Sequence, residues 1–541
     1  MDSFSTEEQF VTKSGIPVKE FYTRDDLTGF DPARDLGAPG KPPFTRGCYP
    51  SMYRNRPWRI RQLTAFGTVE DERDRIMYAL GMGETAVTLL PDMNILYMWD
   101  IDHPEIRSRK DDVGLYAPPI HSLRDYDVIF KDIPLDKTYT GILGIVQSMV
   151  FSHSCYFALA ENLGVPLTKI SGTGMNDMHT SYLSWAGVDQ IAPRDILRFV
   201  GDITEFCVQN APHWIPISFS GHNIRETGIN AYQEIAIILA NAAVYIDEVL
   251  SRGRLKIDDF GYTMAATHLS SDGDFFEEIA KFRAMRRMWY KFLTERYHAT
   301  DPHALRLRIH AQSSGASLTY QQPMNNVIRV AYQILAAALG GAQSMNADHF
   351  DEAFSEPSEE AALLAIRTQQ IAQYETHIMN VTDPLAGSYY VESLTNELEE
   401  RAWDYLKKIE EQGYVNALTN GWLHREVMQG MMDKEKRINS GQEKVIGVNC
   451  FQMEEEPFKI ETFRVPPGVY DIEMARLEKL RQERDNARVA QALGEVRRAA
   501  ETGQNLIRPV IEATKVYATG GEIGQIWRDV FAHWNPPVSI A

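Results

Sequence analysis

The segment HWIPISFSGHNIRETG, residues 213–228, contains the pattern that decides the fold. Its first part, up to Gly221, is an apolar run of the length of a β-strand, and an amphipathic helix is expected directly after it, at 230–251. His222 and Asn223 stand side by side between the strand and the helix. Two hydrogen-bonding side chains at the end of a strand indicate a site, so this unit bears on both fold and function.

The same strand-then-helix unit recurs between residues 46 and 350. Strands are expected at 85–90, 139–146, 213–221 and 307–314, and helices at 144–163, 192–211, 230–251, 274–297 and 323–339. Repeated units of this kind predict parallel strands, either in a barrel or in an open sheet. Their number and spacing favour the barrel, so we expect an α/β protein with a (β/α)8 TIM-barrel fold.

The segments on either side of the barrel differ from it in composition. Residues 1–45 are polar and rich in Gly and Pro, which predicts an N-terminal extended arm. The barrel domain is expected over 46–455, and a helical C-terminal region over 456–541, with a boundary near 455–465. Within that region we expect helical structure at 469–503 and at 518–534.

Composition limits the class of protein. The chain has 541 residues and a formal net charge of −19, and such a surface repels nucleic acid and anionic membranes, so neither is an expected partner. The four cysteines are far apart and form no CxxC, so no disulfide framework and no metal site are expected. The N-terminus is unlike a signal peptide, and no apolar run is long enough to span a bilayer. We therefore expect a soluble, cytoplasmic protein.

One basic stretch stands out in this acidic chain. TRGCYPSMYRNRPWRIRQL, residues 45–63, places five arginines among aromatic residues and methionine. If 57–63 is a strand, Arg59, Arg61 and Leu63 point to one face. That face would suit phosphates at one end and an acyl group at the other, because arginine binds phosphate bidentately. The alternative is a solvated edge strand.

Several spaced motifs now become recognisable together. They are the arginine-rich stretch above, GTGMND (172–177), ISFSG and RETG within 217–228, RIHAQSSGASLT (308–319), NNVIRV (325–330) and DPLAGSYYVE (383–392). In this order the motifs resemble the adenosylcobalamin-dependent acyl-CoA mutases of the methylmalonyl-CoA mutase family, over about residues 14–535. The resemblance implies a barrel threaded by the pantetheine arm of CoA and a radical rearrangement of a carbon skeleton. In such enzymes the cofactor supplies the difficult chemistry, and the protein binds, orients and excludes water.

One part of the family pattern is missing. Members carry a cobalamin-binding domain with a DxHxxG motif, and the nearest string here, DIDHPEI (100–106), has the wrong spacing. The resemblance therefore implies the large, substrate-binding subunit of a split mutase, with no cobalamin-binding domain on this chain. A separate small subunit would carry DxHxxG and the cobalt ligand of adenosylcobalamin, in a heterotetramer or larger assembly.

The resemblance also assigns roles to individual residues. The positions carried over to the CoA arm and the substrate are Tyr49, Met52, Arg56, Arg61, Thr88, Thr173, His213, His310 and Gln312. Gln343, Asp348 and Glu352 are carried over to cofactor binding, near the CoA arm and the adenosyl group. Glu226 matches the acid that faces the upper side of cobalamin, with a salt bridge at the barrel rim as the alternative.

Two neighbouring residues depart from the family pattern. Where familiar members have Tyr-His, this chain has His222-Asn223. The resemblance implies that Asn223 holds the thioester carbonyl through its amide and that His222 lies against the adenosyl group. The alternative is that this pair does not contact the reacting groups, which would favour a non-catalytic barrel subunit of a heteromeric mutase.

The acyl pocket departs as well. Leu63 and Trp185 stand where methylmalonyl-CoA mutase holds a free carboxylate with Tyr and Arg, Leu90 where the hydroxyisobutyryl enzyme has Asp, and Met175 where a glutamine is usual. A carboxylate would be left unpaired there, so we expect a branched or aromatic acyl group.

One cation leaves a second possibility open. Arg59 stands where the family often has Thr, and it or Arg54 could hold a carboxylate. An aryl-substituted succinyl-CoA therefore stays open at this point. An isobutyryl- or 2-hydroxyisobutyryl-type substrate, as in other members of the family, is a further alternative.

Overall fold

The computed structural model describes residues 10–536 except 64, 186, 188, 455–463 and 465. Its centre is an eight-stranded sheet in the order β1-β9-β8-β7-β6-β4-β3-β2, and the pairs are parallel. The strands are β1 (Arg59–Ile60), β2 (Val87–Leu89), β3 (Tyr139–Ile142), β4 (Ser171–Met175), β6 (Trp214–Ser220), β7 (Ala266–Ser271), β8 (Arg308–Ser313) and β9 (Ser344–Asn346). The Thr85 N–H donates to the carbonyl of Ile60 at 3.0 Å and links the segment before β2 back to β1. The predicted (β/α)8 barrel is confirmed.

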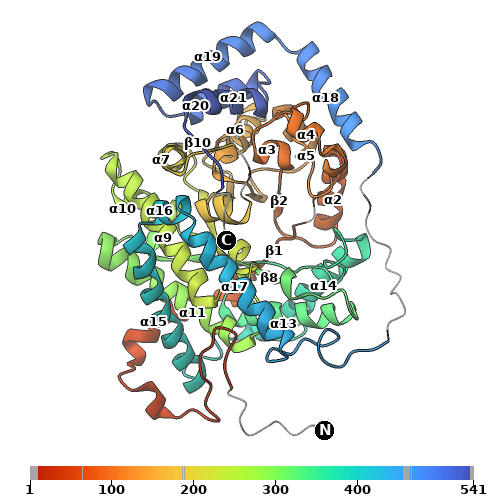
Figure 1. Ribbon diagram of the computed structural model, residues 1–541. Coiled ribbons are helices and arrows are strands. Elements are labelled where there is room, and N and C mark those ends of the chain that lie inside the picture. The colour runs from red at the N-terminus through yellow and green to blue at the C-terminus, as the bar shows by residue number, and fades with distance from the viewer. Residues whose placement is uncertain are drawn as a thin grey trace.

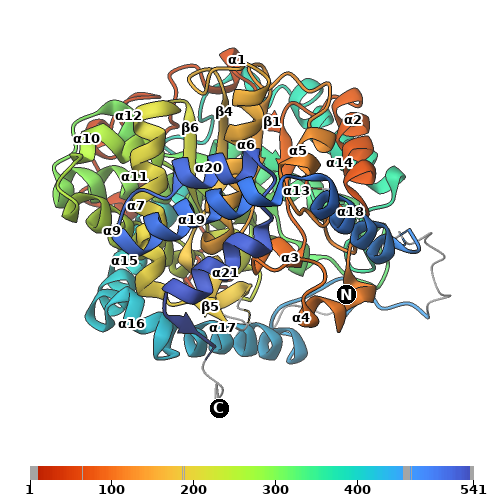
Figure 2. The ribbon, with the colours of Figure 1, turned by 90° about the horizontal axis from the view of Figure 1, so that it is seen from above.

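Helices surround this barrel on the outside (Figures 1 and 2). The main ones are α2 (Val69–Gly81), α5 (Leu123–Ile129), α6 (Val146–Asn162), α7 (Pro193–Asn210), α9 (Ala231–Ser251), α11 (Phe275–Lys291), α13 (Asn325–Gly340) and α14 (Glu359–Tyr374). The five predicted helices are present as α6, α7, α9, α11 and α13. All seven residues of β6 are buried, which explains its continuous apolar sequence.

Outer helices cover two sides of the barrel. Figure 1 shows α15 (Tyr389–Gln412) beside α9 and α11, followed by α16 (Tyr414–Thr419) and α17 (Trp422–Asn439). The C-terminal helices α19 (Asn486–Thr502), α20 (Ile507–Lys515) and α21 (Gly520–Val530) gather beside α6 and α7. The helix α18 (Val469–Glu483) lies apart from them, where its Glu483 accepts from Arg124 of α5 at 2.7 Å. No helix within the described ranges is both long and apolar enough to cross a membrane.

The helical stretch expected at 469–503 is interrupted. It breaks between α18 and α19, because the Asp485 side chain accepts hydrogen bonds from the N–H groups of Ala487 and Arg488 and begins a new helix. The guanidinium of Arg198 on α7 donates to the carbonyls of Ala499 and Gln504, which fixes the end of α19 to the barrel. The predicted boundary at 455–465 lies almost entirely outside the described residues.

Candidate active site

Three cavities lie in sequence along the barrel axis, and strand β8 shows their order. Arg308, at the start of β8, lines the first, which we call the entrance cavity (about 140 Å³). His310 lines both the entrance cavity and a narrow neck of about 20 Å³. Gln312 lines both the neck and a third space of about 460 Å³, the rim cavity, at the carboxyl ends of the strands. The cavities therefore form one path through the barrel.

The sequence-predicted residues distribute along this path. Those that line the entrance cavity are Tyr49, Met52, Arg56, Arg59, Arg61, Thr173, His213, His310 and Gln343. Those that line the neck are Arg61, Leu63, Thr88, Thr173, Met175, His310 and Gln312. Those that line the rim cavity are Leu63, Leu90, Trp185, Gln312, Asp348 and Glu352.

The entrance cavity is strongly cationic. Four arginines line it, and no carboxylate is found among its described lining residues. The Arg59 guanidinium lies over the ring of Tyr139 at 4.2 Å, and Arg56 lies 5.5 Å from the ring of Tyr49. Arg61 is buried, and its Nε donates to Thr88 Oγ1 at 3.0 Å. The alternative of a solvated edge strand is wrong for this side chain, because it is only 5% exposed.

The rim cavity has one apolar side and one acidic side. Leucines, methionine and aromatic rings form the first side, together with Asp92, whose carboxylate accepts from the N–H groups of Met93 and Gly114. Asp348, His349, Glu352 and Glu356 form the second side. No Lys or Arg is present among the described residues that line it. The predicted apolar residues Leu63, Leu90 and Trp185 thus meet in one cavity, whereas Met175 lies in the neck.

The acidic side carries perturbed groups. Oδ1 of Asp348 accepts from the amides of Gln312 (2.9 Å) and Asn346 (3.0 Å), while its buried Oδ2 has no hydrogen-bond partner. Burial, followed by the charges of Glu352 and Glu226, raises the pKa of Asp348 well above its usual range. Burial lowers the pKa of His349, because it disfavours the charged imidazolium. The carboxylate of Glu352, 2.9 Å away, has the opposite and larger effect together with its neighbouring acids, and the pKa of His349 is raised to about 10.

Glu356 offers a test of this electrostatic environment. Burial, followed by the carboxylate of Glu352, raises its pKa to about 7. Since a Glu of an unfolded chain ionises near pH ~4.3, stability falls as the pH rises from there through about 7. We expect Glu356→Gln to raise the melting temperature over wild type at about pH 8 and to differ little from it at about pH 5. Thermal melts across this range check the prediction, with the exposed Glu375→Gln as control. A difference that does not depend on pH would contradict it.

His222, Asn223 and Glu226 lie on or just after the short helix α8 (Gly221–Arg225). The Asn223 amide donates to Thr180 Oγ1 at 3.2 Å and lies 3.8 Å from Met175 Sδ. Glu226 accepts from Ser270 Oγ at 3.1 Å and from the backbone N–H of Ala316 at 2.6 Å. Its nearest basic group within the described chain is His222 Nδ1 at 4.0 Å, so it makes hydrogen bonds at the rim rather than a salt bridge with Lys or Arg.

His268 is a site residue that the sequence analysis missed. It lines the neck from β7, directly opposite His310 in the register of β7 and β8. Its ring stacks on that of His222, with centroids 4.8 Å apart and an interplanar angle of 14°. One feature of the sequence could have indicated this residue: it is a single histidine in the middle of the run ATHLSS, which forms β7.

Comparison with known proteins agrees with this geometry. The family model described as methylmalonyl-CoA mutase matches residues 11–533. The chain belongs to the methylmalonyl-CoA mutase family. It is 39% identical over 519 residues to the 2-hydroxyisobutanoyl-CoA mutase large subunit of Aquincola tertiaricarbonis, covering 95% of this chain and 91% of that protein. It is 37% identical over 531 residues to methylmalonyl-CoA mutase of Cereibacter sphaeroides, covering 97% of this chain and 73% of that protein.

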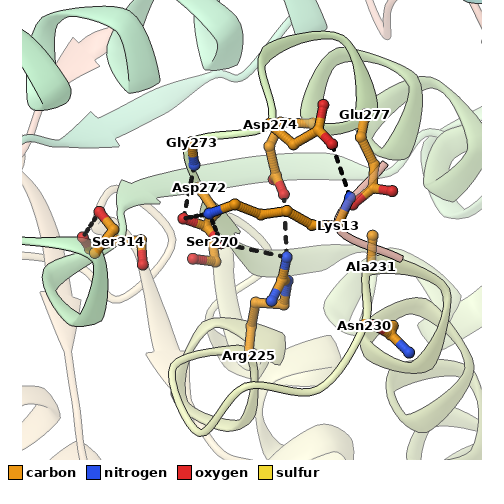
Figure 3. Close-up of polar contacts among 12 residues, drawn as sticks. Lys13, Arg225, Asn230, Ala231, Ser270, Asp272, Gly273, Asp274, Glu277 and Ser314 are labelled. Atoms are coloured by element: carbon orange, nitrogen blue, oxygen red, sulfur yellow. Dashed lines mark hydrogen bonds and ion pairs between the residues drawn. The ribbon is translucent and has the colours of Figure 1, made fainter. Parts of the chain in front are cut away.

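In this member of the methylmalonyl-CoA mutase family, buried charges hold helix α8 against the rim. Figure 3 shows the side chains of Lys13 and Arg225 converging on Asp272, which directly follows β7. The Lys13 Nζ lies 3.1 Å and the Arg225 guanidinium 3.4 Å from this carboxylate. The Ser14 N–H donates to Glu277 at 3.1 Å. The N-terminal segment therefore contacts the end of β7 and helix α11, and Arg225, directly before Glu226, binds the same carboxylate as Lys13.

We expect Lys13→Met to lower the free energy of unfolding by about 1–3 kcal/mol, because it leaves the buried Asp272 with one cation fewer and removes the ion pair with Glu443. Lys19, whose side chain is 66% exposed and pairs with Asp26, provides the matched control. Lys19→Met is expected to change stability by less than about 0.5 kcal/mol. Denaturant unfolding of both variants measures the two changes in the free energy of unfolding. Equal changes would show that the buried contact of Lys13 stabilises the protein no more than an exposed ion pair does.

Proposed function

We propose that the chain is the large, substrate-binding subunit of an adenosylcobalamin-dependent acyl-CoA mutase whose substrate has a branched or aromatic acyl group without a free carboxylate. The observation that carries this proposal is the path through the barrel. It begins in a cavity with four arginines and ends in a cavity whose described lining contains none.

The path fits a CoA thioester whose phosphates lie in the entrance cavity and whose acyl group lies in the rim cavity. The arginines of the entrance cavity suit the phosphates of CoA, because guanidinium groups form paired, charge-assisted hydrogen bonds with phosphate. The pantetheine arm then follows Thr173 and His310 toward the neck. The acyl group lies beyond it, in the rim cavity.

The walls of the rim cavity favour a neutral acyl group. Leu63, Leu90 and Trp185 provide apolar contact, and the carboxylates of Glu352 and Glu356 face them. The imidazolium of His349 in that lining is already paired with Glu352 at 2.9 Å, so a substrate carboxylate would meet no unpaired cation among the described lining residues and would be repelled by these acids. Arg59 lines the entrance cavity instead, which supports a neutral acyl group over an aryl succinyl group.

Residues at the rim fit the cofactor. The unpartnered Oδ2 of Asp348 and the carboxylate of Glu352 are polar groups that suit the hydroxyl groups of an adenosyl ribose, which can both donate and accept. When bound, adenosylcobalamin supplies the radical that starts the rearrangement, and a small partner subunit supplies its cobalt ligand. Gln343 lines the entrance cavity at the opposite end of the path, which supports contact with the CoA arm, one of the two places expected for it.

The protein's own contribution is to bind, orient and exclude water. The neck has room for about one water molecule, so a thioester that occupies it is shielded from solvent. The second candidate function, a barrel without catalysis, is favoured by the Asn223 amide being engaged within the protein. The arginine-lined cavity argues against it, because one of its arginines, Arg61, is buried without a carboxylate partner in the described chain, and a structural subunit has no need of such a cation.

The decisive experiment combines the purified chain, its small subunit, adenosylcobalamin and a panel of acyl-CoAs. The panel runs from isobutyryl- and pivalyl-CoA to a phenyl-substituted succinyl-CoA, with methylmalonyl-CoA as control. We expect substrate-dependent cob(II)alamin by electron paramagnetic resonance, and an isomerised thioester, with a neutral branched or aromatic acyl group. A signal only with methylmalonyl-CoA or the phenyl-substituted succinyl-CoA, both of which carry a free carboxylate, would overturn the pocket assignment. CoA binding without turnover across the panel would favour the non-catalytic barrel.

A further inference from the structure

Three imidazole rings meet at the neck. His268 stands between His222, at 4.8 Å between centroids, and His310, at 4.7 Å. The three residues come from α8, β7 and β8, so neighbouring elements of the barrel bring them together. His268 and His310 line the neck between the cationic and apolar cavities, and His222 stacks on His268. In the proposed binding mode, the thioester group that joins CoA to its acyl group lies against the rings of His268 and His310.

The tautomer of His268 follows from its surroundings. Its Nδ1 lies 3.2 Å from the hydroxyl of Ser220, which is completely buried. No other acceptor for that hydroxyl is found in the described part of the chain, so the hydroxyl donates to Nδ1. This places the ring proton on Nε2.

That Nε2 has no hydrogen-bond partner of normal geometry, although the Gln312 side chain lies beside it. A buried donor without a partner costs about 1–3 kcal/mol, and such groups in native proteins call for an explanation. A ligand with an acceptor oxygen in the neck would supply the missing partner. The thioester carbonyl of a bound acyl-CoA is such a group.

Asn223 is less suited to this role. One proton of its amide is donated to Thr180 Oγ1, and the amide also lies against Met175 Sδ. To reach a carbonyl in the neck, it would have to give up the contact with Thr180. His268 already lines the neck and gives up nothing.

We propose that His268 is a catalytic residue whose Nε2–H donates a hydrogen bond to the carbonyl oxygen of the substrate thioester, in place of Asn223. This inference rests on the proposed acyl-CoA function. Burial, followed by the neighbouring His310, His222 and Arg61, holds the pKa of His268 well below its usual value. The donor is therefore a neutral imidazole, which polarises the carbonyl without a net charge in the neck.

The test uses the vibration of the carbonyl itself. The full chain is mixed with isobutyryl-CoA labelled with ¹³C at the carbonyl, and isotope-edited infrared spectra are recorded for wild type, His268→Phe and Asn223→Ala. Phenylalanine keeps a flat ring in the stack and removes the donor. We expect the shift of the bound carbonyl band to lower frequency to be lost in H268F and retained in N223A. In the complete mutase, kcat is expected to fall about 10²–10³-fold in H268F with little change in KM.

Other results would contradict the role of His268 or the acyl-CoA function on which it rests. A shift that is lost in N223A and retained in H268F returns the role to Asn223 and overturns the inference. Failure of the labelled thioester to bind wild type overturns the proposed function on which the inference rests. Melting curves check that H268F is folded. If it is not, His268→Leu is measured in the same way, and an unchanged carbonyl band in that variant overturns the inference.

Discussion

Replacing Arg61 with methionine is expected to weaken binding of a CoA thioester by about 100-fold and, in the ligand-free chain, to raise the free energy of unfolding by about 1–3 kcal/mol. Arg61 is only 5% exposed. Its Nε is bonded to the neutral Thr88, and no carboxylate pairs with it in the described chain. Burial accordingly lowers its pKa. A buried cation without an anion costs stability, and a bound phosphate would offset that cost.

A second variant tests whether the position of the Arg61 guanidinium matters as well as its charge. A Cβ at Gly141 on β3 would lie 1.9 Å from Nη2 of Arg61, so Gly141→Ala displaces the guanidinium without removing it. We expect this variant to lose affinity for the thioester and to gain no stability. Isothermal titration calorimetry with isobutyryl-CoA and denaturant unfolding provide the two readouts, and Arg107→Met, at an exposed arginine, is the control. If R61M binds as wild type does, Arg61 does not face the CoA phosphates.

The second large effect concerns Trp185. Its backbone is fixed, because its N–H donates to the carbonyl of Thr180 and its own carbonyl accepts from the Tyr97 hydroxyl at 3.4 Å. Trp185→Arg therefore brings a cation into the rim cavity without moving the wall. We expect the ratio of affinities for methylmalonyl-CoA over isobutyryl-CoA to rise about 10–100-fold. The carboxylate of Glu352 competes for the new guanidinium, so a value near the lower end is expected.

The measurement is a competition titration of both thioesters on the full chain. Trp185→Phe is the matched control, because it removes ring area and adds no charge. It is expected to weaken both thioesters alike and to leave the ratio unchanged. An unchanged ratio in W185R would show that the acyl group does not reach this wall.

The strands that the sequence predicted are those with a clear pattern. β6 is a seven-residue buried run, and its apolar composition identified it. β9 has three residues, and β4 contains two glycines within SGTGM, so neither provides enough periodicity to be found. Tertiary pairing with neighbouring strands, rather than local propensity, makes these segments extended.

The sequence predicted individual residues of the candidate site, but it did not predict their positions along the barrel axis. Gln343 and Glu352 are close in sequence, yet β9 separates them, and they line opposite cavities. His268 was missed because a single histidine in a strand has no distinctive spacing. Only the pairing of β7 with β8 places it beside His310. Roles in a barrel depend on how far along a strand each residue lies, which a motif alone does not contain.

The contact between the N-terminal arm and the rim has a consequence for biosynthesis. Lys13 and Asp272 are 259 residues apart in the chain, and Ser14 and Glu277 are 263 apart. The first of each pair leaves the ribosome long before its partner exists, since domains fold as their segments are completed during synthesis. Closing so long a loop is also entropically slow, so docking of the arm comes late, after β7 and α11 have formed. A nascent chain thus carries the arm as a free tail until the barrel is nearly complete, and the surroundings of Glu226 are among the last parts of the molecule to mature.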